Sequence, residues 1–208
     1  MRPVKDWYRT PDWDEAARAD FEARLGRARG QRSEYLRVKA AALEGAGLLD
    51  DAARMYERLL EEHPDRLHES YTHERLGDVA RAQGRLDEAE RRYRRVLAFQ
   101  PLKWSSGMTA VSLAEILLDQ GRVDDAAEAL DQAEESSVTA FHANLFRYLV
   151  AVVRVATAHG DGGSAADAAA RALDLIDAPD QYSRHPGIGA VRTDDATVAM
   201  LKAVAAPT

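Results

Sequence analysis

The chain has 208 residues, of which 46% are hydrophobic and only 7% aromatic, with a net charge of −7 and no cysteine. The lack of cysteine excludes disulfides, thiolate zinc sites and a cysteine nucleophile, and the negative charge disfavours general binding to nucleic-acid phosphates. Abundant alanine, with few aromatic and β-branched residues, favours helices over strands.

Residues 1–31 combine an aromatic segment with a predicted helix. Trp7, Tyr8 and Trp13 lie within seven positions, and such side chains are common anchors at interfaces. Apolar residues at helical spacing predict a helix over residues 12–29; they are Ala17, Phe21, Leu25 and Ala28. The aromatic segment could dock on a second copy, which would give a homo-oligomer, or into a groove of the same chain. Alternatively, it covers the first of the units that follow.

A repeat of about 37 residues occupies the middle of the chain. Its four glycines are spaced 37, 37 and 39 residues apart, and each is followed five residues later by an alanine. The glycines are Gly47, Gly84, Gly121 and Gly160, and the alanines are Ala52, Ala89, Ala126 and Ala165. A period of this size predicts a stacked array of similar units and not one globular core.

Each unit is predicted to contain two helices that meet at its glycine. The glycine closes the first helix in a left-handed conformation, and acidic residues open the second helix, where they favour the positive end of its dipole. In the fourth unit, Ser164 with Asp167 predicts a capping box. Small residues at Ala40, Gly77 and Ala114 predict a close approach of the two helices. The units span residues 33–64, 70–101, 107–138 and 146–177.

The second unit carries Leu76-Gly77, Gly84, Ala89, Tyr93 and Pro101. This pattern resembles the signature of the tetratricopeptide repeat (TPR), a helix–turn–helix unit of ~34 residues. The resemblance implies an all-α, right-handed α-solenoid of about four units over residues 32–178, with terminal helices as caps. The first unit departs from the family pattern, because Lys39 stands where the family prefers leucine. A composition rich in alanine and arginine favours a bacterial source.

Residues 179–208 are predicted to form an ordered loop and a last helix. Thr193 is the expected N-cap, and Asp194 and Asp195 would lie in the first turn of the helix. One side of this helix is apolar, with Val198, Leu201 and Val204. We expect it to cover the exposed end of the last repeat, as the N-terminal helix covers the first.

Candidate catalytic and metal sites are weak. His68 and His73 lie five residues apart, whereas two zinc ligands on one helical face need a spacing of four. No nucleophile elbow or phosphate-binding loop is present. The basic residues Arg91, Arg92 and Arg94 each follow an acid by four residues, which is the arrangement of surface ion pairs. The sequence therefore predicts no enzyme activity, no metal, no cofactor and no nucleic-acid partner.

Targeting segments are not predicted either. The N-terminus lacks the apolar run of a signal peptide, and no stretch reaches the ~18 apolar residues of a membrane span. The expectation is a cytoplasmic protein without a membrane partner.

The resemblance also implies where a partner binds, because the first helix of each TPR unit lines an inner groove. The groove-facing residues that it implies are Arg37, Tyr71, Glu74, Asp78, Arg81, Met108, Val111, Glu115, Arg147 and Arg154. The alternative is that these positions form a solvated face. Asn144, the single asparagine, lies off these positions, which argues against a groove that grips a peptide with asparagine amides.

The sequence thus predicts a non-catalytic scaffold that binds a protein or peptide partner. The alternative is a regulator or sensor that controls a partner enzyme or transcription factor, acting through that protein because no DNA-reading segment remains in the chain. An enzyme would need a polar cluster in the groove, where Glu74, Asp78 and Glu115 are the acids to inspect.

Overall fold

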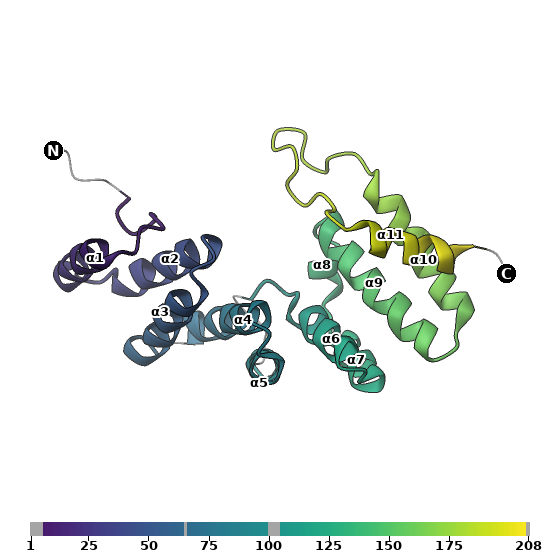
Figure 1. The fold of residues 1–208 in the computed structure, drawn as a ribbon, viewed down its shortest axis with the longest axis horizontal. Helices are drawn as coiled ribbons and strands as arrows, with labels where there is room; N and C mark the ends of the chain where they lie inside the picture. Colours follow the sequence, from purple (N-terminus) through teal and green to yellow (C-terminus); the bar gives the residue numbers. More distant parts are fainter. Residues whose placement is uncertain (1–5, 65, 100–104, 207–208) are drawn as a thin grey trace. The chain divides into compact units, whose positions relative to one another are not determined.

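The computed structural model describes residues 6–64, 66–99 and 105–206, without the side chains of residues 66–68. Every regular element in these ranges is a helix, so the all-α prediction is confirmed (Figure 1). The chain divides into two compact units, Met1–Ser105 and Ser106–Thr208. Each unit contains two helical hairpins and one terminal helix.

The first unit is built from consecutive hairpins that stack on each other. Its helices are α1 (Glu15–Arg27), α2 (Arg32–Gly45), α3 (Leu49–Glu62), α4 (Arg66–Ala82) and α5 (Leu86–Leu97). Helix α2 pairs with α3, α4 pairs with α5, and α3 packs on α4. Its buried core cluster includes Phe21 and Leu25 of α1, which therefore covers the first hairpin as predicted.

The second unit repeats this plan with one addition. Its helices are α6 (Thr109–Asp119), α7 (Val123–Leu130), α8 (Glu135–Val138), α9 (His142–Ala158), α10 (Gly162–Ile176) and α11 (Asp195–Ala205). Helix α9 pairs with α10 and also packs on both α6 and α7, and the short α8 was not predicted. Helix α11 lies on α10 and buries Leu201 in their common core, which confirms the C-terminal cap.

The four repeated glycines close their hairpins in the same way. Their φ angles are 77°, 74°, 75° and 75° for Gly47, Gly84, Gly121 and Gly160. In every turn the residue after the glycine donates its N–H to the carbonyl five residues earlier, at 2.9 Å. This is the hydrogen bond of a Schellman motif, which needs a left-handed residue that glycine supplies without strain. The fourth unit therefore has the same turn as the other three.

Three predicted helix starts are wrong by one to three residues. The N-caps are Asp14, Asp161 and Asp194, and each carboxylate accepts the N–H of the residue three positions later, at 2.8, 3.0 and 2.7 Å. Ser164 therefore lies inside α10, and Thr193 precedes the cap of α11. An aspartate combines the capping hydrogen bond with a favourable interaction with the helix dipole, which explains why it caps in preference to a nearby Ser or Thr.

Helices α4 and α5 approach closely at Gly77. A Cβ atom added there would lie 2.5 Å from Cε1 of Tyr93, a fully buried ring. The Tyr93 hydroxyl donates to Asp78, the residue after Gly77, at 2.8 Å. In the preceding repeat the Tyr56 hydroxyl donates to Glu44 instead, one helical turn beyond Ala40, at 2.9 Å. Glycine at position 77 leaves the space that the Tyr93 ring occupies, and the tyrosine hydroxyl bonds to a different position in each of the two repeats.

The N-terminal aromatic segment packs against the first hairpin of its own chain. The Trp7 ring centre lies 5.3 Å from that of Phe21 and 5.0 Å from that of Tyr35, and Trp13 Nε1 donates to Asp51 at 2.9 Å. The segment therefore covers the first repeat of its own chain, which was one of the predicted alternatives. Self-association through the same rings stays a prediction.

The loop between α10 and α11 is ordered by its contacts with the start of α9. The Gln181 side chain accepts the N–H of His142 at 2.7 Å, and the Gly189 carbonyl accepts the N–H of Ala143 at 2.8 Å. These N–H groups have no partner within the helix. The loop therefore caps α9, and the prediction of an ordered loop is confirmed.

Candidate functional site

In the first unit, the predicted binding residues Arg37 and Tyr71 meet between α2 and α4. The Arg37 guanidinium lies 5.5 Å from the centre of the Tyr71 ring, and both side chains are half-buried. Arg37 also donates twice to the Glu34 carboxylate, at 2.8 and 2.7 Å. The hydrogen bond to Glu34 raises the pKa of the Arg37 guanidinium, although burial opposes this. The two helices thus present a fixed arginine on an aromatic ring.

A polar network lies beside this pair and links the two hairpins. Arg75 donates to Glu44 through Nε at 3.0 Å, with a second contact through Nη2, and to Asp78 through Nη1 at 2.9 Å. Tyr56 and Tyr93 donate to the same two carboxylates. Burial raises the pKa of Asp78, and the charge of Arg75 opposes that effect. Both carboxylates are committed to donors within the fold, so the network joins the hairpins and holds the face rigid.

Sequence reasoning missed Arg75, which is central to this network. Its signal was a charge of opposite sign about one repeat away: Glu44 and Arg75 are 31 residues apart, and Glu115 and Arg147 are 32 apart. A search for acid–arginine pairs at that separation would have found both contacts.

In the second unit, the predicted residues are joined by ion pairs between α6 and α9. Arg147 donates to Glu115 at 2.9 and 2.7 Å and to Ser112 at 3.0 Å. Arg154 donates to Asp119 at 2.9 Å. The two arginines therefore bridge the first helices of consecutive hairpins, as Arg75 does in the first unit.

Three of the predicted groove residues are buried and do not present a surface. Val111 is 0% exposed, Met108 4% and Glu74 5%. In the second unit both α7 and α9 pack on α6, which has buried residues all along its length. Arg81 is half-buried in the last turn of α4. The predicted groove residues that keep part of their surface accessible are all half-buried: Arg37, Tyr71, Asp78, Arg81, Glu115, Arg147 and Arg154.

His73 is buried beside the arginines of α5. Arg92 can only donate, so the His73 Nδ1 atom, 3.3 Å away, must accept and is unprotonated. Burial, together with the charges of Arg92 and Arg95, lowers the pKa of His73 to about 4. Among the residues that the structure describes, no group of three or more His, Asp or Glu side chains is arranged to hold a metal ion.

Within the described ranges, the helices lack the length and apolar character that a bilayer-spanning segment needs.

Repeated hairpins, identical glycine turns and terminal covering helices define a helical-repeat protein. The family model described as "Tetratricopeptide repeat" matches residues 37–103 and 74–137, which correspond to the hairpins from α2 to α7. The chain is therefore a tetratricopeptide repeat protein. No curated protein matches it. The α9–α10 hairpin lies outside the matched residues and shares their turn geometry.

Proposed function

We propose that this chain is a non-catalytic cytoplasmic scaffold that binds a protein or peptide on the face formed by α2 and α4. TPR repeats generally mediate protein–protein interaction. The observation that supports the location is the half-buried pair of Arg37 and Tyr71. Arginine and tyrosine are enriched among the residues that dominate binding energy. Both side chains are already held in place, so binding would cost little additional side-chain conformational entropy.

The chemistry of the face favours a partner segment that offers hydrogen-bond acceptors. Arg37 donates to Glu34 through Nε and Nη2 and also interacts with Tyr71, and a guanidinium has five N–H donors to share between such partners and a ligand. A backbone carbonyl or a carboxylate of the partner could bind there, while an apolar side chain packs on the Tyr71 ring. We propose Arg147 and Arg154 of the second unit as a second region that contacts the partner.

A photo-cross-linking experiment tests this location. A benzophenone amino acid is placed at position 71 in one variant and, as a matched control, at the exposed position 91 of α5, a second helix of a hairpin. Irradiation of host cells should link a defined protein to position 71, and Arg37→Glu should remove that product. Equal labelling from position 91, or a product insensitive to Arg37→Glu, would contradict the proposal.

The identity of the linked protein separates the scaffold from the regulatory alternative. For a regulator, the linked protein is an enzyme or a transcription factor, and its activity changes when the purified chain is added. For a scaffold, the bound protein keeps its own activity.

A further inference from the structure

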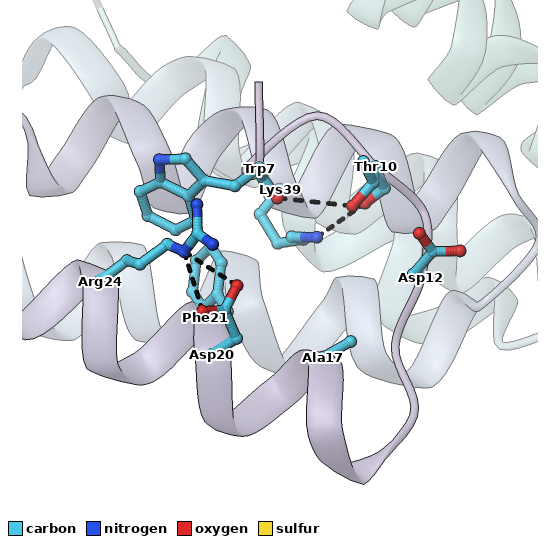
Figure 2. Close-up of a pocket in the computed structure, with 8 residues that line it drawn as sticks. All are labelled: Trp7, Thr10, Asp12, Ala17, Asp20, Phe21, Arg24 and Lys39. Atoms are coloured by element: carbon cyan, nitrogen blue, oxygen red, sulfur yellow. Dashed lines mark hydrogen bonds and ion pairs between the residues drawn. The ribbon is translucent and has the colours of Figure 1, made fainter. Parts of the chain in front are cut away.

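The two ends of the chain differ in how their charges are matched. At the N-terminal end, a cavity of about 180 Å³ lies between the N-terminal segment and α1 (Figure 2). Lys39 in its wall is only 2% exposed, and its Nζ atom donates to the Thr10 carbonyl at 2.7 Å, as Figure 2 shows. Burial lowers the pKa of the Lys39 ammonium, and the charge of Asp12 opposes this. Arg24 at the rim is paired with Asp20 at 2.8 Å. The charges around this cavity are therefore matched within the chain.

At the C-terminal end, helix α11 carries two charges that are not matched. Its buried side lies on α10, where Leu201 enters the common core. Its exposed residues are three alanines and two side chains of opposite charge: Asp195, Ala196, Ala199, Lys202 and Ala203. Among the residues that the structure describes, neither Asp195 nor Lys202 forms an ion pair. The two lie seven positions apart, about 10 Å along the helix axis, which is too far for a pair within α11.

The exposed residues of α11 form one continuous face. At about 100° per residue, Ala199 lies at the centre of this face. Asp195 and Lys202 follow one edge, and Ala196 and Ala203 follow the other. Because the centre carries only a methyl group, a second helix can approach to about 8 Å between the axes, the short end of the range for packed helices.

We propose that α11 pairs with α11 of a second copy of this chain, in the antiparallel direction and about a two-fold axis close to Ala199. Such an axis keeps each edge of the face on its own side and reverses its direction. Asp195 of each copy then meets Lys202 of the other, so that two ion pairs form. A parallel pair would place like charges side by side. The charges therefore select the antiparallel arrangement.

The order of the charges favours a second copy as the occupant of this face. An acid and a base at the two ends of a face that is otherwise alanine match the same sequence when it is reversed. The contact is short, because α11 has 11 residues and is about 16 Å long. A small contact gives weak association, and the expected Kd is on the order of 100 μM. This surface is separate from the α2–α4 face and from the N-terminal aromatic segment.

A cysteine at the centre of the face tests the geometry, because the chain has no cysteine of its own. In the full chain, Ala199→Cys should form a disulfide-linked dimer on mild oxidation, since the two-fold axis brings the two copies of position 199 within disulfide distance. Ala23→Cys, an exposed alanine of α1, is the matched control and should link more slowly by roughly tenfold or more. Equal rates for the two variants would contradict the proposed axis.

Exchange of the charges tests the ion pairs, with sedimentation velocity up to about 1 mM as the measurement. Lys202→Glu and Asp195→Lys should each weaken self-association by roughly tenfold, because both pairs become like-charge contacts. An equimolar mixture of the two variants should restore it, since each mixed dimer again has two pairs of opposite charge. Arg27→Glu, an exposed change in the last turn of α1, should have no effect.

The wild type and the mixture keep this test decisive if one variant folds poorly, which circular dichroism would show. The proposal predicts a wild-type dimer and recovery in the mixture. A wild type that stays monomeric at about 1 mM, a dimer that both charge reversals leave unchanged, or a mixture that associates no better than its components would overturn it.

Discussion

Substitution of Gly77 by alanine tests the close contact of α4 and α5. The new Cβ would lie 2.5 Å from Cε1 and 2.7 Å from Cδ1 of Tyr93, whereas carbon atoms pack at about 3.5–4.0 Å. The buried ring must move by about 1 Å, which costs about 1–3 kcal/mol in a packed core and weakens the Tyr93–Asp78 hydrogen bond by about 1 kcal/mol. The better helix propensity of alanine offsets about 1 kcal/mol of this destabilisation. The expected net loss of unfolding free energy is about 2 kcal/mol.

Gly26 provides the matched control, because it is an exposed glycine inside α1 with nothing within 4 Å of an added Cβ. Gly26→Ala should stabilise the chain by about 0.5–1 kcal/mol through helix propensity alone. Urea denaturation followed by circular dichroism at 222 nm compares the two variants. Equal stability of Gly77→Ala and Gly26→Ala would refute the steric argument.

A double-mutant cycle assigns the effect to the ring itself. The third repeat has Ala114 and Leu130 at the positions of Gly77 and Tyr93, so an alanine with a leucine is already accommodated in this fold. In a Tyr93→Leu background, Gly77→Ala should cost less than about 0.5 kcal/mol, because the steric conflict is gone. An unchanged cost in that background would mean that α4 rejects alanine for another reason.

Three further variants probe other parts of the structure. His73→Gln should remove part of the loss of stability at low pH. The pKa of His73 in the folded chain, about 4, lies below the ordinary 6.5, so only the unfolded chain takes up this proton as the pH falls from 7.5 to 5. The wild type should therefore lose about 2 kcal/mol more unfolding free energy than the variant over this range, and His185→Gln is the exposed control. Gly189→Ala places a Cβ 2.5 Å from Phe141 at a φ of 73°, so hydrogen exchange at the start of α9 should become faster, and unchanged protection would contradict the capping role of the loop. Lys39→Met should leave the unfolding free energy within about 1 kcal/mol of the wild type, because an apolar side chain can replace a buried cation; a loss of several kcal/mol would show that the ammonium is a structural necessity.

The sequence predicted the hairpins because their signals are local. A glycine at each turn and acids after it act within a few residues, and all four turns formed where the spacing placed them. Helix starts were less well predicted, since several polar residues near Asp161 and Asp194 compete to cap, and the aspartate in each set combines the capping hydrogen bond with a favourable dipole interaction.

The candidate site was only partly predictable, because burial depends on elements that are distant in sequence. Val111 and Met108 follow the pattern of a groove-lining helix, yet both are buried in the second unit, where α7 and α9 pack on α6. Arg37 and Tyr71 stand 34 residues apart, and only the stacking of α2 and α4 brings them into contact. Lys39 was noted as a departure from the family pattern, but the cavity beside it requires the fold of the N-terminal segment.

The affinity of the cross-linked partner tests the central claim most directly. Isothermal titration calorimetry would compare the wild type with Tyr71→Ala and with Arg91→Ala, an exposed change on α5, after circular dichroism confirms that each variant is folded. If the α2–α4 face binds the partner, Tyr71→Ala should weaken Kd by roughly tenfold or more and Arg91→Ala should leave it nearly unchanged. Equal affinities for all three proteins would show that the partner binds elsewhere.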